Sequence, residues 1–286
     1  MTALAPVAPV PESAPAASRR RDRPRLWRGV VLALAALYFL VPLAASFWYT
    51  VHNQSTGLSL SPYAELWTAE GFLTSLLLSL VLALATIVLV LLLTLPAMIT
   101  VRLAAPRLRP VMEVICTLPL VVPPITLVAG VSRSLQVGGD VLAPTPFWGT
   151  LIAIQNQDFP LVLVFVYVVL VLPFVYRSLD AGLRTMDVRT LVEAARNLGA
   201  SWPHVMFRVI VPNLRSALAS ASFLTLALVL GEYTVASILG YQPFAVWIVT
   251  ISGSKGQLSV AASVLSLLLT WLLLLTISGG SRDRSA

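Results

Sequence analysis

The chain has 286 residues, of which 58% are hydrophobic and 11% charged, and its mean hydropathy is +0.88. These values lie far outside the range of soluble domains and predict an all-α, polytopic membrane protein. The pI near 10.2 could suggest a nucleic-acid partner, but the basic residues flank apolar stretches and form no patch with interleaved aromatic residues. A disulfide framework or metal cluster is also excluded, because Cys116 is the only cysteine and His52 and His204 are far apart.

The N-terminal 18 residues are rich in Pro, Ala and Ser and are predicted to be disordered. Together with the arginine cluster that follows, they form a basic cytoplasmic tail over residues 1–26. Residues 27–57 contain the first transmembrane helix. The arginine cluster could also begin a signal peptide, but the apolar run behind it has span length and Ala44-Ala45-Ser46 is a weak cleavage site. We therefore predict an uncleaved first span.

Six apolar stretches are long enough to cross a bilayer as helices. They are residues 27–50, 71–101, 111–131, 160–176, 216–239 and 258–278. Seventeen of the 19 Lys and Arg residues fall on the side of the N-terminus, and only Arg133 and Lys255 fall on the other side. The positive-inside rule then places both termini in the cytoplasm, including the tail at 279–286.

A polar segment between the fourth and fifth spans, residues 180–215, predicts two short helices separated by a glycine. Asp187 can cap the first helix, and Gly199 stands where a C-terminal glycine belongs. Ser201 can cap the second helix, Pro203 is tolerated in its first turn, and Pro212 ends it. Each helix has an apolar face at helical spacing. These faces comprise Val188, Leu191, Val192, Ala195 and Leu198, and Trp202, Val205, Met206, Val209 and Ile210.

This segment resembles the cytoplasmic EAA loop of permease subunits in bacterial binding-protein-dependent ABC importers. That loop reads Glu-Ala-Ala, three residues, Gly, nine residues and Ile-x-Leu-Pro. This chain has Glu193-Ala194-Ala195, Gly199 and Val209-Ile210-Val211-Pro212, with valine at the two departures. The resemblance extends over residues 58–278 and includes Leu95-Pro96-Ala97, Leu118-Pro119, Pro123-Pro124 and Leu172-Pro173-Phe174. Gly231-Glu232-Tyr233 resembles the branch that handles polyamines, ferric iron, sulfate, molybdate and phosphonates.

The resemblance implies a MetI-like permease domain of six spans in the bacterial cytoplasmic membrane, surrounded by lipid. Its implied partners are cytoplasmic ATPase subunits, a second permease subunit, identical or related, and an extracytoplasmic solute-binding protein, but no nucleic acid. The residues implied to couple to the ATPase are Glu193, Ala194, Ala195, Gly199, Trp202, Phe207 and Pro212. The chain has no P-loop for ATP, since its one lysine, Lys255, precedes Gly256. We expect a non-catalytic subunit without cofactors, and ATP hydrolysis by a partner.

Glu232 is the one acidic residue well inside a predicted span, and an unpaired carboxylate there is costly. It lines the substrate path with Tyr233, or it forms a structural hydrogen bond or ion pair with a neighbouring span. Pro123 and Pro124, with Pro119, must loosen the third span, and we expect Pro123 and Pro124 near the path. The resemblance favours a polyamine such as spermidine or putrescine as solute, with ferric iron, phosphonate or another small solute as alternatives.

Three other interpretations remain open. The loop helices could serve only as a membrane-surface pair. An ion-coupled secondary transporter would carry several intramembrane charges, whereas an intramembrane hydrolase would need a nucleophile motif such as Gly-x-Ser-Gly, which the sequence lacks.

We expect Glu113 to pair with Arg109 at the surface. Residues 133–159 form an outer segment that contacts a binding protein or serves as a re-entrant or surface loop.

Overall fold

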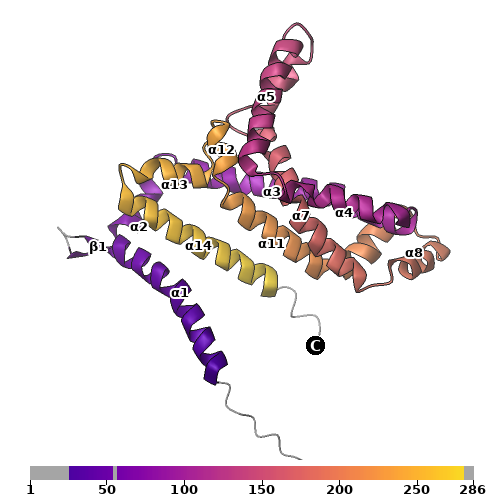
Figure 1. Ribbon diagram of the computed structural model, residues 1–286, viewed down its shortest axis with the longest axis horizontal. Coiled ribbons are helices and arrows are strands. Elements are labelled where there is room, and N and C mark those ends of the chain that lie inside the picture. The colour runs from indigo at the N-terminus through magenta and orange to yellow at the C-terminus, as the bar shows by residue number, and fades with distance from the viewer. Residues whose placement is uncertain (1–25, 54–56, 280–286) are drawn as a thin grey trace, which may run out of the picture. The chain divides into compact units, whose positions relative to one another are not determined.

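The computed structural model describes residues 26–53 and 57–279 (Figure 1). Almost all of the predicted tails, residues 1–26 and 279–286, lies outside the described residues. The chain divides into two compact units, Met1–Ala45 and Ser46–Ala286. Helix α1, Leu26–Val51, begins in the first unit and matches the first predicted span.

The second unit consists almost entirely of helices. A two-stranded antiparallel hairpin, β1 (His52–Asn53) with β2 (Gly57–Leu58), follows α1. The α-helices are α2 (Ser61–Glu65), α3 (Phe72–Leu103), α4 (Arg109–Thr117), α5 (Pro124–Leu142), α6 (Trp148–Ile154), α7 (Leu161–Arg184), α8 (Val188–Asn197), α9 (Trp202–His204), α10 (Val211–Asn213), α11 (Arg215–Leu230), α12 (Thr234–Ile238), α13 (Phe244–Ser252) and α14 (Gly256–Gly279). Shorter elements are the 3-10 helices η1 (Leu66–Thr68), η2 (Pro106–Leu108) and η3 (Leu118–Leu120) and the π-helix η4 (Val205–Ile210).

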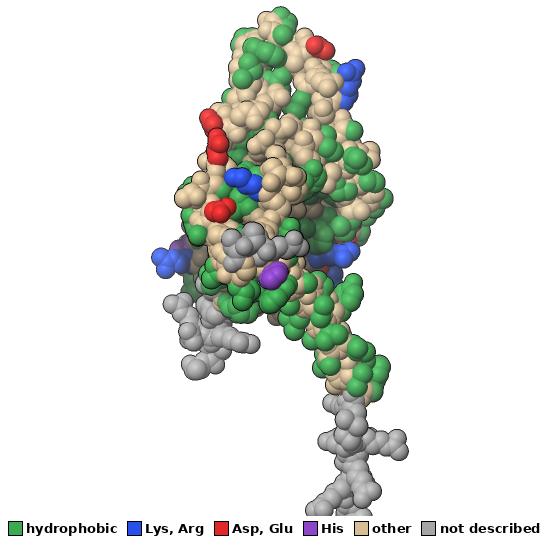
Figure 2. Space-filling view, turned by 90° about the vertical axis from the view of Figure 1, so that its left-hand side faces the viewer, with side chains coloured by type: hydrophobic (Ala, Val, Ile, Leu, Met, Phe, Trp, Pro, Cys, Tyr) green, Lys and Arg blue, Asp and Glu red, His purple; other side chains and the backbone are tan. Residues whose placement is uncertain are grey.

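The predicted all-α, six-span organisation is confirmed, with two of the spans bent. Within the described residues, four helices are long and apolar enough to cross a membrane, namely α1, α3, α7 and α14, and two bent helix pairs raise the number to six. Along α3, large apolar side chains are exposed, among them Leu77, Leu84 and Leu92. A surface that faces lipid has this character, because a charged group is costly there. The end of the molecule drawn in Figure 2 instead carries acidic and basic side chains among the hydrophobic ones.

The predicted span over residues 111–131 is broken at the prolines that were expected to loosen it. The helical stretch Pro106–Leu120 meets α5 at 94°, and α5 runs away from the layer of α3, α4, α7 and α11 (Figure 1). Pro124 explains the break, because its ring forces the preceding residue out of the helical region. Pro123 accordingly has an extended backbone, with ψ of 137°. The outer segment 133–159 is also largely helical, since it contains the end of α5 and all of α6.

The prediction of one helix over residues 216–239 is wrong. Helix α11 ends at Leu230, residues 231–233 form a break, and α12 follows. Before α11, the chain bends by 79° from the stretch Trp202–Asn213. The fourth span, predicted to end near residue 176, continues as α7 to Arg184.

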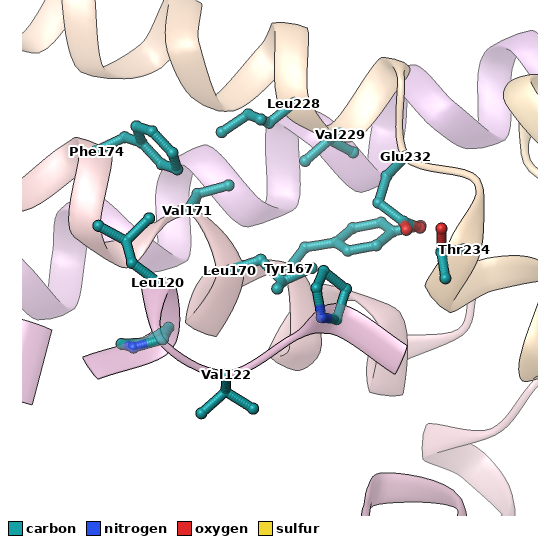
Figure 3. Close-up of a pocket in the computed structure, with 12 residues that line it drawn as sticks. Leu120, Val122, Tyr167, Leu170, Val171, Phe174, Leu228, Val229, Glu232 and Thr234 are labelled. Atoms are coloured by element: carbon teal, nitrogen blue, oxygen red, sulfur yellow. The ribbon is translucent and has the colours of Figure 1, made fainter. Parts of the chain in front are cut away.

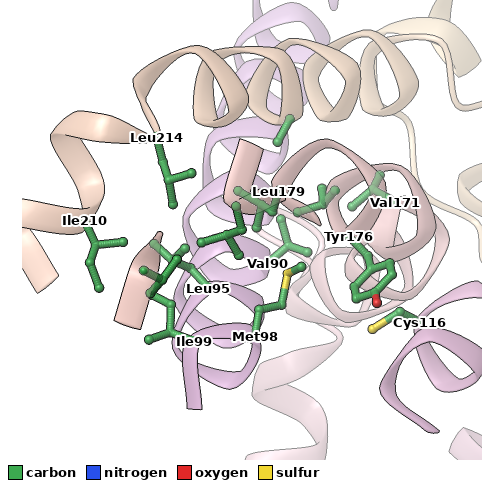
Figure 4. Close-up of a cluster of buried hydrophobic side chains, with 14 of the residues drawn as sticks. Val90, Leu95, Met98, Ile99, Cys116, Val171, Tyr176, Leu179, Ile210 and Leu214 are labelled. Carbon is green, nitrogen blue, oxygen red and sulfur yellow. The ribbon is translucent and has the colours of Figure 1, made fainter. Parts of the chain in front are cut away.

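The core of the second unit lies where α3, α7 and α11 pack together. One buried cluster joins these helices to α4 and the loop helices, and Figure 4 shows part of it. Its members include Val90, Met98, Cys116, Tyr176 and Leu214. The helices approach closely at Gly182 of α7, which lies directly against α11. Lipid supplies no hydrophobic driving force for helix association. Small residues stabilise such a crossing instead, because they let the two helices pack closely.

Candidate functional site

A cavity of about 280 Å³ lies between η3, the start of α5, α7 and the break between α11 and α12 (Figure 3). Nine of its twelve lining side chains are apolar. The lining residues are Pro119, Leu120, Val122, Pro124, Tyr167, Leu170, Val171, Phe174, Leu228, Val229, Glu232 and Thr234. Among these residues Glu232 is the one acid and none is basic. The two broken helices therefore supply opposite walls, as irregular backbone at membrane depth does where it lines a cavity.

Glu232 makes structural hydrogen bonds and also lines this cavity. Its Oε1 accepts a hydrogen bond from the Val235 backbone N–H at 2.8 Å, and its Oε2 accepts one from the Ala236 N–H at 3.3 Å. These bonds satisfy free donors at the start of α12. The Tyr167 hydroxyl donates to Oε2 at 3.2 Å from α7. The carboxylate thus joins two helices and also faces the cavity (Figure 3).

The other residues predicted for the substrate path are divided. Pro124 lines the cavity, whereas Pro123 and Tyr233 are not among its lining residues. The sequence also did not anticipate the contribution of Tyr167, because its hydroxyl meets Glu232 across 65 residues of chain.

The first loop helix, α8, begins as predicted. The Asp187 carboxylate accepts the Thr190 backbone N–H at 3.2 Å and the Thr190 hydroxyl at 2.6 Å. These hydrogen bonds lower the pKa of Asp187 below its usual value. Val188 and Val192 are buried against the rest of the chain. On the exposed side, Glu193 forms an ion pair with Arg189 at 2.8 Å.

Gly199 makes the turn between the two loop helices in the left-handed conformation that its position predicted, with φ of 83°. Its N–H donates to the Arg196 carbonyl at 2.9 Å. The Arg196 guanidinium donates to the Ala200 carbonyl at 2.9 Å and lies 5.7 Å from the centre of the Trp202 ring. The turn is therefore held by contacts from both sides.

The second loop helix is less regular than predicted. Its stretch contains α9, the π-helix η4 and α10, which includes Pro212. The predicted Ser201 cap is wrong, because the Ser201 side chain makes no capping hydrogen bond. Leu198, predicted on an apolar face, is 90% exposed. Trp202 and Phe207 are 52% and 68% exposed, so the loop presents a bare apolar surface.

A cluster of charged residues surrounds Asp180, near the end of α7, and was not predicted. Asp180 is 7% exposed. Its Oδ1 lies 2.5 Å from the Arg102 guanidinium of α3 and 3.2 Å from the Arg109 guanidinium of α4, and its Oδ2 lies 2.6 Å from Arg184. The expected pair between Glu113 and Arg109 is wrong, since Arg109 turns to Asp180 instead. The i,i+4 spacing of Asp180 and Arg184 was the one local signal of this cluster.

The long apolar helices and the two sharply bent helix pairs indicate a membrane protein with several spans. Residues 107–283 match the family described as "Binding-protein-dependent transport system inner membrane component". Because this match covers more than half of the chain, the chain belongs to that family.

Two known proteins are similar to this chain. The spermidine/putrescine transport system permease protein PotB of Haemophilus influenzae is 31% identical over 138 residues, which are 47% of this chain and 47% of PotB. The chain thus spans about half the length of that relative. A solved structure, titled "Crystal structure of a bacterial ABC transporter involved in the import of the acidic polysaccharide alginate", matches with a TM-score of 0.59 and 16% identity, covering 92% of this chain and 100% of that one. This second similarity confirms the fold.

Proposed function

We propose that this chain is the non-catalytic permease subunit of an ATP-driven importer and forms half of the path for a small organic cation of the polyamine kind. A second permease subunit supplies the other half, and separate ATPase subunits hydrolyse ATP. An extracytoplasmic binding protein delivers the solute. Membership of the family supports the transport role, and the similarity to PotB supports the class of solute.

The lining of the cavity is the observation that carries the choice of solute. Glu232 offers a carboxylate to an ammonium group, and the surrounding apolar side chains offer contact to a methylene chain. An anionic solute such as a phosphonate would meet Glu232 with no basic side chain among the residues that line the cavity. The geometry therefore favours a cation over an anion.

The test uses the complete importer in liposomes, with labelled spermidine and putrescine. Glu232→Gln keeps an oxygen that can accept the N–H groups of α12 but removes the charge. Hydrogen bonds to charged groups contribute enough for uptake to fall by on the order of tenfold or more. Glu113→Gln is the matched control, because Glu113 is exposed and does not line the cavity. Unchanged polyamine uptake by Glu232→Gln would contradict the choice of solute. So would a wild-type importer that takes up ferric iron or phosphonate but no polyamine.

The loop from α8 to α10 is proposed as the contact with the ATPase, through its Glu193-Ala194-Ala195 and Gly199 region. Its buried residues already pack against this chain, which leaves Leu198, Trp202 and Phe207 for a partner. Phe207→Asp should reduce co-purification of the ATPase subunit. Leu60→Asp is the control, because Leu60 is similarly exposed at 61% but lies near the opposite end of the spans. Equal ATPase recovery from both variants would leave the loop as a surface helix pair.

We further propose that the loop and both termini lie in the cytoplasm, as the distribution of basic residues predicts. Single cysteines introduced at Ser55 and Ser201, in a background without Cys116, should differ in their reaction with an impermeant reagent. The cysteine at position 55 should react in intact cells, and the cysteine at position 201 only after the membrane is permeabilised. Reaction of both cysteines in intact cells would contradict this topology.

A further inference from the structure

The carboxylate of Asp180 joins three helices at one point. Arg102 is in the last turn of α3, Arg109 is the first residue of α4, and Asp180 belongs to α7. Arg102 also donates to the Leu183 carbonyl at 2.8 Å, so it hydrogen-bonds to the backbone of α7 as well as to the Asp180 carboxylate. Arg184 completes the cluster, but it lies on the same helix as Asp180 and connects no second element.

This cluster lies between the loop and the cavity. Asp187, which caps the first loop helix α8, comes only seven residues after Asp180. In the other direction, α4 leads from Arg109 to η3, where Pro119 and Leu120 line the cavity. At 1.5 Å per residue the nine residues of α4 span about 13 Å. Helix α4 therefore connects the cluster directly to the cavity wall.

Packing alone holds the other part of α4 against α7. Cys116 of α4 and Tyr176 of α7 belong to the same buried cluster and lie near one another in Figure 4. At the Arg109 end, the carboxylate of Asp180 brings two like charges, Arg102 and Arg109, onto the same oxygen. Without that carboxylate the two guanidinium groups would repel each other, and this end of α4 would lose its attachment.

We infer that Asp180 is a positioning residue, which transmits movement of the loop helix α8 to the cavity wall by holding the start of α4 on α7 through Arg109. The inference rests on the proposed function, since it assumes that the loop receives the ATPase. The ion pair between Arg109 and Asp180 then links the loop to the cavity wall. Helix α8 moves with the end of α7, and α4 follows because Arg109 is bound to Asp180.

The experiment compares two arginine variants in the complete importer in liposomes. Arg109→Gln removes the bond between α4 and α7, whereas Arg184→Gln removes a bond to the same carboxylate within α7. We measure solute imported per ATP hydrolysed and the stimulation of ATP hydrolysis by the loaded binding protein. The ratio should fall at least about fivefold for Arg109→Gln, the lower end of typical coupling effects, and stay within about twofold of wild type for Arg184→Gln. The ATPase subunit should still co-purify with both variants.

A rescue variant separates this role from a merely structural one. Arg109→Lys keeps a cation that can reach Asp180, and it should restore the ratio of solute to ATP to near the wild-type value. Equal losses for Arg109→Gln and Arg184→Gln would mean that the cluster only balances charge, and an unchanged ratio for Arg109→Gln would mean that it transmits nothing. Either result overturns the inference. Absence of ATP-driven uptake by the wild-type importer would instead refute the proposed function.

Discussion

Gly182→Ala tests the close packing of α7 on α11 directly. A Cβ atom at position 182 would lie 2.5 Å from the Cβ of Ala217 and 3.1 Å from a Cδ of Leu214. Carbon atoms prefer separations of about 3.5–4.0 Å, so the added methyl group requires the helices to part by about 1 Å. The alanine side chain has no rotamer that could relieve the contact. Overpacking of this kind costs about 1–3 kcal/mol, and we expect thermal unfolding of the purified protein in detergent to occur at a lower temperature.

A second substitution makes this prediction specific. Ala217→Gly removes the atom in conflict, and the double variant Gly182→Ala with Ala217→Gly moves one methyl group from α11 to α7. The double variant should recover most of the lost stability, because the cost of about 1 kcal/mol for glycine within a helix is moved from α7 to α11 and is not added. Gly149→Ala is the control, because a Cβ there meets nothing within 4 Å. Equal effects of Gly182→Ala and Gly149→Ala, or failure of the double variant to recover, would refute the packing argument.

Three further predictions concern the loop. Gly199→Val should lower the amount of ATPase subunit that co-purifies, because a β-branched residue at φ of 83° is strained by about 1 kcal/mol or more. Gly199→Asn should retain more of the ATPase subunit, because asparagine tolerates this conformation better. Equal losses for the two variants would contradict the backbone explanation. The lowered pKa of Asp187 stabilises the start of α8 above the carboxyl group's ordinary pKa of about 4, and this contribution is lost as the pH falls through the lowered pKa. Hydrogen exchange at the Thr190 amide, corrected for its intrinsic rate, should therefore accelerate in acid in the wild type but not in Asp187→Asn. Ser201→Ala should leave exchange in η4 unchanged, since the Ser201 side chain caps nothing; faster exchange would reinstate the cap.

Hydropathy alone was sufficient to predict where the long helices lie, but not where helices break. Helices α3 and α14 closely match their predicted spans, because an uninterrupted apolar run of that length leaves few alternatives. The prolines of the third span indicated a weak point, yet the 94° bend depends on the extended backbone at Pro123. A hydropathy average over a window has the same value for a straight span and for two helices joined at a corner.

The first loop helix and the turn at Gly199 were predicted well because their signals are local, whereas the irregular second stretch was not. The Asp187 cap acts across three residues, and Gly199 sets the turn through its own backbone. The Asp180 cluster was missed because its partners Arg102 and Arg109 are 78 and 71 residues away. Sequence proximity instead suggested Glu113 for Arg109. The structure favours Asp180, because a carboxylate that is largely withdrawn from water needs compensating charge more than an exposed one does.

Helix α7 carries both polar contacts on which the proposed mechanism depends. Tyr167 reaches Glu232 beside the cavity, and Asp180 holds the arginine residues of α3 and α4 thirteen residues later, about 20 Å along the helix. An apolar side chain in a bilayer gains little from contacting another helix in place of lipid. The arrangement of the helices therefore depends on hydrogen bonds between them and on close packing at small residues. Helix α7, which leads into the loop, carries two such contacts, while others join other helices, as the Phe244 N–H of α13 does when it donates to Ser79 Oγ of α3 at 2.7 Å. In the mechanism that we propose, a movement at the loop would therefore reach the cavity along α7 and α4, because these two helices are joined at Asp180.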